Sequence, residues 1–254
     1  MSAWAALDAE LDRWRSEGRA ATLWWRDDDA AAATPALHRL LAVRRGAGVP
    51  LALAAIPAAA EDSLAAALAG EAGVTVLVHG FAHRNHAGPG ARKAEFGAGR
   101  DPSEAAAEIA AGKTRLEALL PGRTAPVFAP PWNRIAAAIV ARLPGLGFVG
   151  ISAIGARAGR EAAAGLVQVN VHADPVDWRG TRGFRGGGAL VNDLAGHLAA
   201  RRTGAADPDE PTGLMTHHAV HDGCTWRFLE RLFERSLARG ARWISAPAAF
   251  GLGS

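Results

Sequence analysis

The sequence is poor in the residues that would tie it to an oxidising compartment or to a membrane. Cys224 is its single cysteine, which excludes an intramolecular disulfide and makes a reducing compartment the simpler expectation. No apolar run reaches the roughly 18 to 20 residues that a membrane-spanning helix needs. Residues 1–20 carry Asp8, Glu10 and Asp12 where a secretory signal peptide would be apolar, and they predict an amphipathic helix instead. We therefore expect a cytoplasmic protein.

A strong charge of one sign is also absent. The formal net charge is +3, with 28 Lys and Arg against 25 Asp and Glu. The arginines are spread along the chain, whereas a nucleic-acid-binding protein usually carries a basic stripe or cluster. We expect neither nucleic acid nor a membrane as a partner, and the sequence leaves the oligomeric state open.

Short apolar runs alternate with helical patterns along most of the chain. Aspartate before proline at 101–102 predicts a helix start, and Pro-Gly at 121–122 predicts its end. A second clear helix is predicted at about 226–239. The predicted strands are residues 21–25, 49–54, 74–78, 125–128, 147–151, 166–171, 212–216 and 241–244.

This alternation predicts a parallel α/β architecture, either a barrel or an open sheet. The length suits one large domain, and nothing in the sequence reads as a linker between domains. We expect a single domain over residues 1–254, with residues 1–20 as a helical extension. The glycine-rich stretch at 178–188 predicts a mobile loop.

Polar residues collect where the predicted strands end. "WWRDDDA" marks the end of the first strand, "HGFAHRNH" the third, "FAPPWN" the fourth, "HADPVDW" the sixth and "THHAVHD" the seventh. In parallel α/β proteins the functional groups gather at the C-terminal ends of the strands. A site is therefore predicted at that end of the fold.

Two of these motifs suggest a metal site. The adjacent carboxylates at 27–29 require a positive partner if any of them is buried. The simpler alternative is that one caps a helix and the others face solvent. His79 and His83 are four residues apart, which lets both imidazoles face one point, although they could equally be unrelated surface or core histidines. One carboxylate with two histidines would make a three-ligand catalytic metal site with open positions.

The ordered motifs "RDDDA", "HGFAH", "FAPPWN", "DPVDW" and "LMTHH" resemble the five motifs of the polysaccharide deacetylases, the NodB-type carbohydrate esterases of family 4. The resemblance runs from about residue 22 to residue 245. It implies a distorted (β/α) barrel with about seven parallel strands. It also implies metal-dependent removal of acetyl groups from N- or O-acetylated sugars or oligosaccharides.

The same resemblance implies a role for each matching residue. Asp28 would be the general base and Asp29 the metal-binding carboxylate. His79 and His83 would be the other two ligands, and His217 would be the general acid. Two imidazoles and a carboxylate suit Zn, Co, Ni or Fe, of which we expect Zn.

The sequence departs from the family pattern at two places. Ala129 stands where the third motif normally carries an arginine that pairs with the catalytic aspartate, and we expect Arg26 or Arg134 to supply that charge. Asp27 is an extra acid in the first motif. It leaves open a shift of one residue in which aspartate is base and which is ligand.

Other motif residues are substrate-binding or supporting candidates. Asp177 could orient His217 or an arginine, or could simply end a turn. Trp132 and Trp178 could stack on a sugar ring, or could belong to the core. Pro131 belongs to the same motif as Trp132 and is expected to support the site.

The remaining histidines carry weaker signals. His218 and His221 flank the general-acid candidate, and we expect them to be exposed to solvent. His38, His172 and His197 match no motif and are expected to be structural.

Two other functions stay open from the sequence. The protein could hydrolyse a non-sugar amide C–N bond with the same metal chemistry. It could also be a catalytically inactive carbohydrate-binding homologue, since the third-motif arginine is missing.

Overall fold

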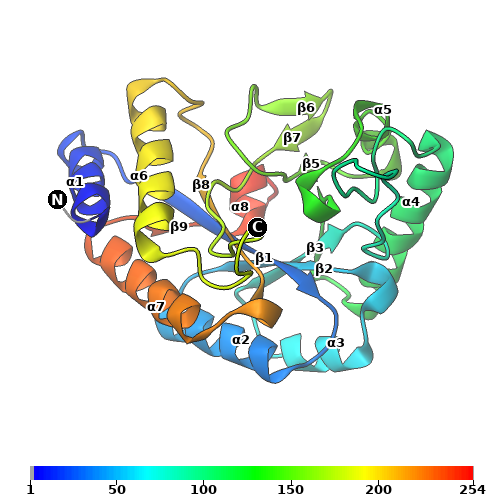
Figure 1. Ribbon diagram of the computed structural model, residues 1–254, viewed down its shortest axis with the longest axis horizontal. Coiled ribbons are helices and arrows are strands. Elements are labelled where there is room, and N and C mark those ends of the chain that lie inside the picture. Colours follow the sequence, from blue (N-terminus) through cyan, green and yellow to red (C-terminus); the bar gives the residue numbers. More distant parts are fainter. Residues whose placement is uncertain (1–2, 254) are drawn as a thin grey trace.

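A parallel barrel lies at the centre of residues 3–253, the part of the chain that the computed structural model describes (Figure 1). Its seven strands are β1 (Thr22–Ala30), β2 (Leu51–Ala55), β3 (Val74–His79), β4 (Thr124–Ala129), β5 (Gly150–Ile151), β7 (Leu166–Gln168) and β8 (Thr212–Thr216). They are adjacent in the order β7-β5-β4-β3-β2-β1-β8, and all these pairs are parallel. The predicted barrel of about seven parallel strands is confirmed.

The segment that follows β7 closes the ring against β8. The backbone N–H of His172 donates to Gly213 O at 2.7 Å, and that of Met215 donates to Ala173 O at 2.8 Å. Two short strands lie outside the ring. β6 (Glu161–Ala163) pairs antiparallel with β7, and β9 (Arg242–Trp243) pairs with the first residues of β1.

The barrel strands are buried on both faces, which explains why they appear in the sequence as continuous apolar runs. Every residue of β2 and of β8 is buried. Alternate side chains of β1 enter different apolar clusters: Trp24 lies inside the barrel with Met215, and Trp25 lies outside it against Phe233.

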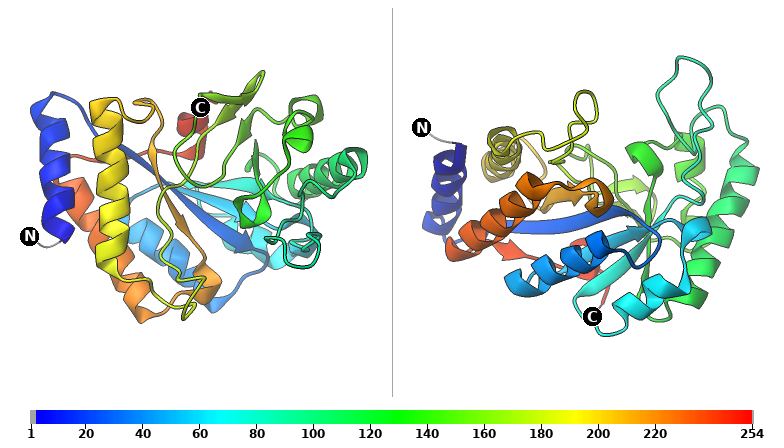
Figure 2. Two further views of the ribbon diagram at one scale, coloured as in Figure 1. Left: turned by 45° about the horizontal axis from the view of Figure 1, so that its top comes forward. Right: turned by 60° about the horizontal axis from the view of Figure 1, so that its bottom comes forward.

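Helices surround the barrel, as Figure 2 shows. The α-helices are α1 (Ala3–Ser16), α2 (Pro35–Ala47), α3 (Asp62–Leu68), α4 (Pro102–Leu119), α5 (Ala137–Val140), α6 (Gly187–Thr203), α7 (Gly223–Ala238) and α8 (Ala246–Phe250). Single 3₁₀ turns are η1 (Pro57–Ala59), η2 (Pro131–Asn133), η3 (Pro144–Leu146) and η4 (His218–Val220). None of the helices within residues 3–253 is both long enough and apolar enough to cross a membrane.

Capping side chains set the helix starts. Asp101 accepts the N–H groups of Ser103 (2.8 Å) and Glu104 (3.0 Å), so α4 begins as the sequence predicts. Asp222 accepts the N–H of Thr225 at 2.8 Å, and α7 therefore begins a few residues before the predicted 226.

The predicted N-terminal helix corresponds to α1, which packs against α6 and α7. Trp14 Nε1 donates to Leu198 O of α6 at 3.2 Å, and Asp8 pairs with Arg235 of α7 and with Arg239, which caps the C-terminus of that helix. Residues 1, 2 and 254 of the expected domain lie outside the described residues.

Several predicted boundaries differ from the structure: the strands predicted at 147–151 and 166–171 are shorter, at 150–151 and 166–168, and two further differences bear on the site. The first strand continues from the predicted 25 to Ala30, so "RDDDA" lies within the strand and not after it. The stretch at 178–188 is not all loop, because Gly187 and Gly188 form the first turn of α6.

Candidate active site

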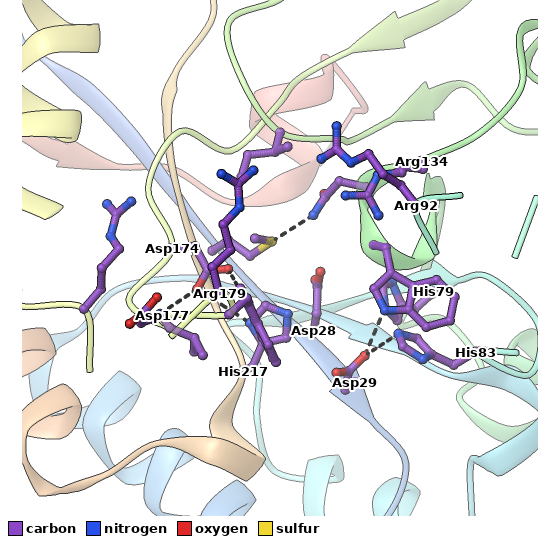
Figure 3. Close-up of a pocket in the computed structure, with 17 residues that line it drawn as sticks. Asp28, Asp29, His79, His83, Arg92, Arg134, Asp174, Asp177, Arg179 and His217 are labelled. Atoms are coloured by element: carbon purple, nitrogen blue, oxygen red, sulfur yellow. Dashed lines mark hydrogen bonds and ion pairs between the residues drawn. The ribbon is translucent and has the colours of Figure 1, made fainter. Parts of the chain in front are cut away.

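A pocket of about 560 Å³ opens at the C-terminal end of the barrel (Figure 3). Its walls come from the ends of β1, β3, β4 and β8 and from the loop after β7. The five residues expected to bind metal or to catalyse all line it: Asp28, Asp29, His79, His83 and His217.

Asp29, His79 and His83 converge on one point of this pocket. Asp29 Oδ1 lies 3.1 Å from His79 Nε2 and 3.3 Å from His83 Nε2. His79 Nδ1 faces Ala129 O at 2.9 Å. If Nδ1 carries the proton and donates to that carbonyl, the lone pair of Nε2 is free for a ligand.

These residues fit a divalent cation. Asp29 Oδ1 is buried and has no hydrogen-bond partner among the described residues, although a buried carboxylate oxygen normally has one. The three ligand atoms lie close enough together to coordinate one ion. Two histidines and one carboxylate leave further positions open, as catalytic zinc sites do.

The protonation of the cluster reflects its mutual charges. Burial by itself raises the pKa of Asp29, but the interaction with the adjacent His79 ring outweighs it and holds that pKa below its usual range. Burial lowers the pKa of His79, but the charges of Asp28 and Asp29 outweigh it and raise that pKa. Burial lowers the pKa of His83, although its ring is more accessible than that of His79.

Unusual backbone conformations orient two of these side chains. Asp29 has φ 71° and His83 has φ 53°, a left-handed conformation that few residues other than glycine adopt. The pairing of β1 with β2 shifts register between Asp27 and Ala30, which is where Asp29 lies. Backbone strain of this kind collects at functional sites, where the surrounding structure holds it in place.

Glu95, which the sequence did not single out, holds the loop that carries His83. Its buried carboxylate accepts the backbone N–H groups of Phe81 (3.1 Å), Ala82 (2.8 Å) and Arg84 (3.2 Å). At Gly80, with φ 62°, a side chain would overlap Glu95 and Pro131.

Arg26 supplies a charge beside Asp28. Its Nε lies 2.8 Å from Asp28 Oδ1 and its Nη2 lies 3.0 Å from Oδ2, a bidentate pair between two buried side chains. Arg26 also donates to Ser152 Oγ (2.6 Å) and Asn133 Oδ1 (2.7 Å), which fixes its position. Arg134, the other candidate, donates to Lys93 O at the pocket edge.

Asp27 lies outside the barrel wall, apart from the cluster of Asp29 and the two histidines. It accepts the hydroxyl of Thr216 at 2.6 Å, the backbone N–H of His218 at 3.1 Å and the ring Nδ1 of His218. Burial would raise the pKa of Asp27, but His218 holds it low, and Asp27 in turn raises the pKa of His218. The expectation that His218 is exposed is wrong, because the ring is buried and pairs with Asp27.

His217 lies across the pocket from the cluster, and its carboxylate neighbour is Asp174, not Asp177. Asp174 Oδ1 is 3.8 Å from His217 Nδ1, and Asp174 Oδ2 accepts Trp178 Nε1 at 2.7 Å. Burial raises the pKa of Asp174. Asp177 instead accepts the backbone N–H groups of Gly180 and Thr181, which makes it the turn residue of its alternative interpretation.

The aromatic candidates lie at the pocket wall. Trp132, with φ 55°, packs on His83 with ring centroids 4.3 Å apart. Trp178 stands edge-on to His217 at 4.8 Å and is 46% exposed. Pro131 is buried beneath Gly80, so it supports the histidine loop and does not line the pocket.

A second cluster joins His172, His197 and Glu210 near the other end of β8. His172 Nδ1 accepts the N–H of Gly213 at 2.9 Å, so its neutral ring carries the proton on Nε2, which faces Glu210 Oε2 at 3.5 Å. Glu210 also accepts backbone N–H groups of Arg157 (3.0 Å) and Asn170 (2.9 Å). Protonated Nε2 cannot bind a cation, so we interpret this cluster as structural.

Comparison with known proteins gives a match in fold only. No family model matches the sequence, and no curated protein matches it. Several solved structures overlay on most of the chain, including the following three. The Bc1960 peptidoglycan N-acetylglucosamine deacetylase is 15% identical, with a TM-score of 0.60, and the match covers 92% of this chain and 90% of that chain. A family 4 carbohydrate esterase from Streptomyces lividans in complex with acetate is 16% identical, with a TM-score of 0.58, and the match covers 88% of this chain and 91% of that chain. A family 4 acetyl xylan esterase from Clostridium thermocellum in complex with a cobalt ion is 14% identical, with a TM-score of 0.56, and the match covers 91% of both chains.

The chain has the fold of the family 4 carbohydrate esterases. The motifs that resemble that family in the sequence therefore lie in a barrel of the matching architecture. Within this carbohydrate esterase fold, Ala129 has a backbone role: its carbonyl faces His79 Nδ1, while Arg26 occupies the space beside Asp28.

Proposed function

We propose that the protein is a metal-dependent hydrolase that removes an acetyl group from an N- or O-acetylated sugar or oligosaccharide. The observation that carries this proposal is the arrangement of one pocket. The convergent cluster of Asp29, His79 and His83 lies in it together with the paired carboxylate of Asp28, and His217 lies across from them.

Asp29, His79 and His83 would hold one divalent ion, and Zn suits this ligand set. An ion bound there would polarise the acetyl carbonyl and make a nearby water more acidic. The cobalt ion in the Clostridium thermocellum esterase of the same fold supports metal binding as a property to test.

Asp28 would act as the general base. Its carboxylate lines the pocket beside Asp29, and it would accept a proton from the attacking water as that water's oxygen bonds to the acetyl carbon. The bidentate hydrogen bonds from Arg26 hold both oxygens of Asp28 in one orientation, so the base is positioned before the substrate arrives.

His217 would act as the general acid. When the bond from the acetyl carbon to the sugar nitrogen or oxygen breaks, the leaving atom needs a proton, and an imidazolium at the opposite wall can donate it. Asp174 lies 3.8 Å from His217 Nδ1 and would favour the ring orientation in which Nε2 carries that proton. The products are acetate and the free amine or alcohol.

Elemental analysis combined with acetate release tests the proposal. Asp29→Asn, His79→Ala and His83→Ala should each lose the ion. Asp28→Asn should keep the ion and lose most acetate release from acetylated sugars, because an amide cannot accept the proton. His86→Ala, in the same loop as His83 but exposed, is the matched control and should keep both properties.

Three outcomes would count against this assignment. If the histidine variants fold and still bind one ion per chain, the metal site is elsewhere. If a non-sugar amide releases product while the sugars release none, the protein is a different C–N hydrolase. If the metal-loaded protein hydrolyses neither class but binds sugar, it is an inactive carbohydrate-binding protein.

A further inference from the structure

Arginines gather at the mouth of the pocket, above the proposed catalytic groups. Arg92 comes from the loop after β3, Arg134 from the segment after β4, and Arg179 and Arg185 from the loop before α6. Figure 3 shows Arg92 and Arg134 beside each other above the two histidines, with Arg179 on the side of Asp174 and His217. Three separate segments thus bring positive charge to one opening.

Three of these arginines have no carboxylate partner. Within residues 3–253 no ion pair involves Arg92, Arg134 or Arg179, whereas Arg185 pairs with Asp193. Burial lowers the pKa of Arg134, and the charges of Arg92 and Arg179 lower it further, so the three guanidinium groups act on one another. Their mutual repulsion is a cost that a bound anion would remove.

Asp29 is the proposed metal ligand, and the other three carboxylates of the pocket already have donors. Asp28 is held by Arg26, and Asp174 accepts from Trp178 and the backbone of Val176. Asp177 accepts two backbone N–H groups of its turn. The anion that would satisfy the arginines must therefore come from outside the protein.

Apolar surface lies beside this charge. Trp178 is 46% exposed and Ile154 is 50% exposed, and both line the same pocket. An exposed indole offers a flat face for the C–H surface of a sugar ring. Its orientation is fixed, because Trp178 Nε1 donates to Asp174.

We propose that the substrate is an acetylated sugar that carries an anionic group, a phosphate or a carboxylate, bound by Arg92, Arg134 and Arg179. This inference rests on the proposed function. Guanidinium groups match both anions because they offer paired N–H donors in one plane. Trp178 would contact the sugar ring between the anion and the acetyl group.

Matched substrates test this inference with the metal-loaded protein. N-acetylglucosamine 1-phosphate and an N-acetylated amino-uronic acid supply the two anions, and methyl N-acetylglucosaminide is the neutral reference. One anionic substrate should show a kcat/KM roughly tenfold or more above the neutral one, since a hydrogen bond between charged groups is worth that factor. The preference should shrink as salt is raised, because the arginines are at the solvent edge.

Substitution locates the effect. The double variant Arg92→Gln/Arg179→Gln should bring the ratio of anionic to neutral kcat/KM close to one. Arg160→Gln changes an exposed arginine outside the pocket and should leave that ratio as in the wild-type protein. Equal ratios in wild-type protein and in the double variant would overturn the inference.

A binding measurement separates this inference from the proposed function. Calorimetric titration of N-acetylglucosamine 1-phosphate and of the amino-uronic acid into wild-type protein needs no turnover. One outcome is that no acetate is released, while an anionic sugar binds to the wild-type protein and binds at least about tenfold more weakly to the double variant. The anion site then stands and the proposed reaction fails. If neither anionic sugar binds more tightly than the neutral glycoside, the anion site fails whatever the activity.

Discussion

Arg26 and Asp28 form a bidentate ion pair from two positions of the same strand, with N···O distances of 2.8 and 3.0 Å. Residues two apart on a strand point to the same face, so this pairing follows directly from the β conformation of β1. The pair explains how the pocket can do without an arginine at Ala129. The charge comes from the strand that carries the proposed base and not from a neighbouring strand.

The first prediction concerns the role of Arg26 in holding Asp28. Arg26→Lys keeps the positive charge but cannot bind both oxygens of Asp28, so we expect kcat to fall roughly 10- to 100-fold while the metal stays bound. Steady-state kinetics with elemental analysis measures both properties. Arg201→Lys is the matched control, because Arg201 is buried at the other end of β8 and should affect stability without changing kcat. An unchanged kcat in Arg26→Lys would remove Arg26 from the mechanism.

The second prediction concerns Asp27 and decides which aspartate binds the metal. Asp27→Asn removes the charge that holds the buried His218, and losing one partner of a buried pair costs about 3 to 5 kcal/mol of unfolding free energy. We expect urea unfolding to show a loss of that order, with the metal content unchanged. Asp29→Asn should instead lose the metal and change the unfolding free energy little. Loss of metal in Asp27→Asn would mean that the ligand assignment is shifted by one residue.

The sequence could predict the site's location better than its internal arrangement. The strand at 212–216 was predicted at its observed bounds, and polar motifs at strand ends correctly indicated a common pocket. Simple alternation would put Asp27 and Asp29 on one face of β1. The register shift and the positive φ of Asp29 break that alternation, and a sequence pattern carries no sign of either.

Other features depend on contacts between distant segments. "HADPVDW" offers two aspartates, and only the fold shows that Asp174 faces His217 while Asp177 closes a turn. Glu95 holds the histidine loop by accepting backbone N–H groups. Almost any residue offers such a group, so the loop sequence carries no sign of this contact. The only signal in the sequence is one acidic residue within a polar loop, and such residues are too common to single one out.

The third prediction separates proton donation from substrate positioning at His217. An amine leaving from an amide must be protonated, whereas an activated phenolate leaves without help. His217→Ala should therefore reduce N-deacetylation far more than cleavage of an activated aryl acetate, measured on the same preparation. Asp174→Asn should show the same bias in weaker form, because it acts through the ring. Equal losses on both substrates would assign His217 to positioning and leave the proton to His221 or solvent.

The fourth prediction is a loss of stability in acid that depends on His172. Burial and, to a smaller extent, the charge of the stacked His197 ring together lower the pKa of His172 to about 4. In the unfolded chain the same group has a pKa near 6.5, so the unfolded state binds the proton first as the pH falls. The contribution of neutral His172 is complete above about pH 6.5 and is lost between there and about pH 4, a change of about 3 kcal/mol.

Urea unfolding of wild-type protein and of His172→Asn from pH 7 to pH 4 measures this contribution. The amide oxygen of asparagine can still accept the N–H of Gly213, so the variant keeps that hydrogen bond but has no group that titrates in this window. Its unfolding free energy should therefore fall less steeply with acid than that of the wild-type protein. His38→Asn, which changes an exposed histidine of α2, should run parallel to the wild-type curve. If the His172→Asn curve also runs parallel to it, the proton that destabilises the fold in acid binds at some other group.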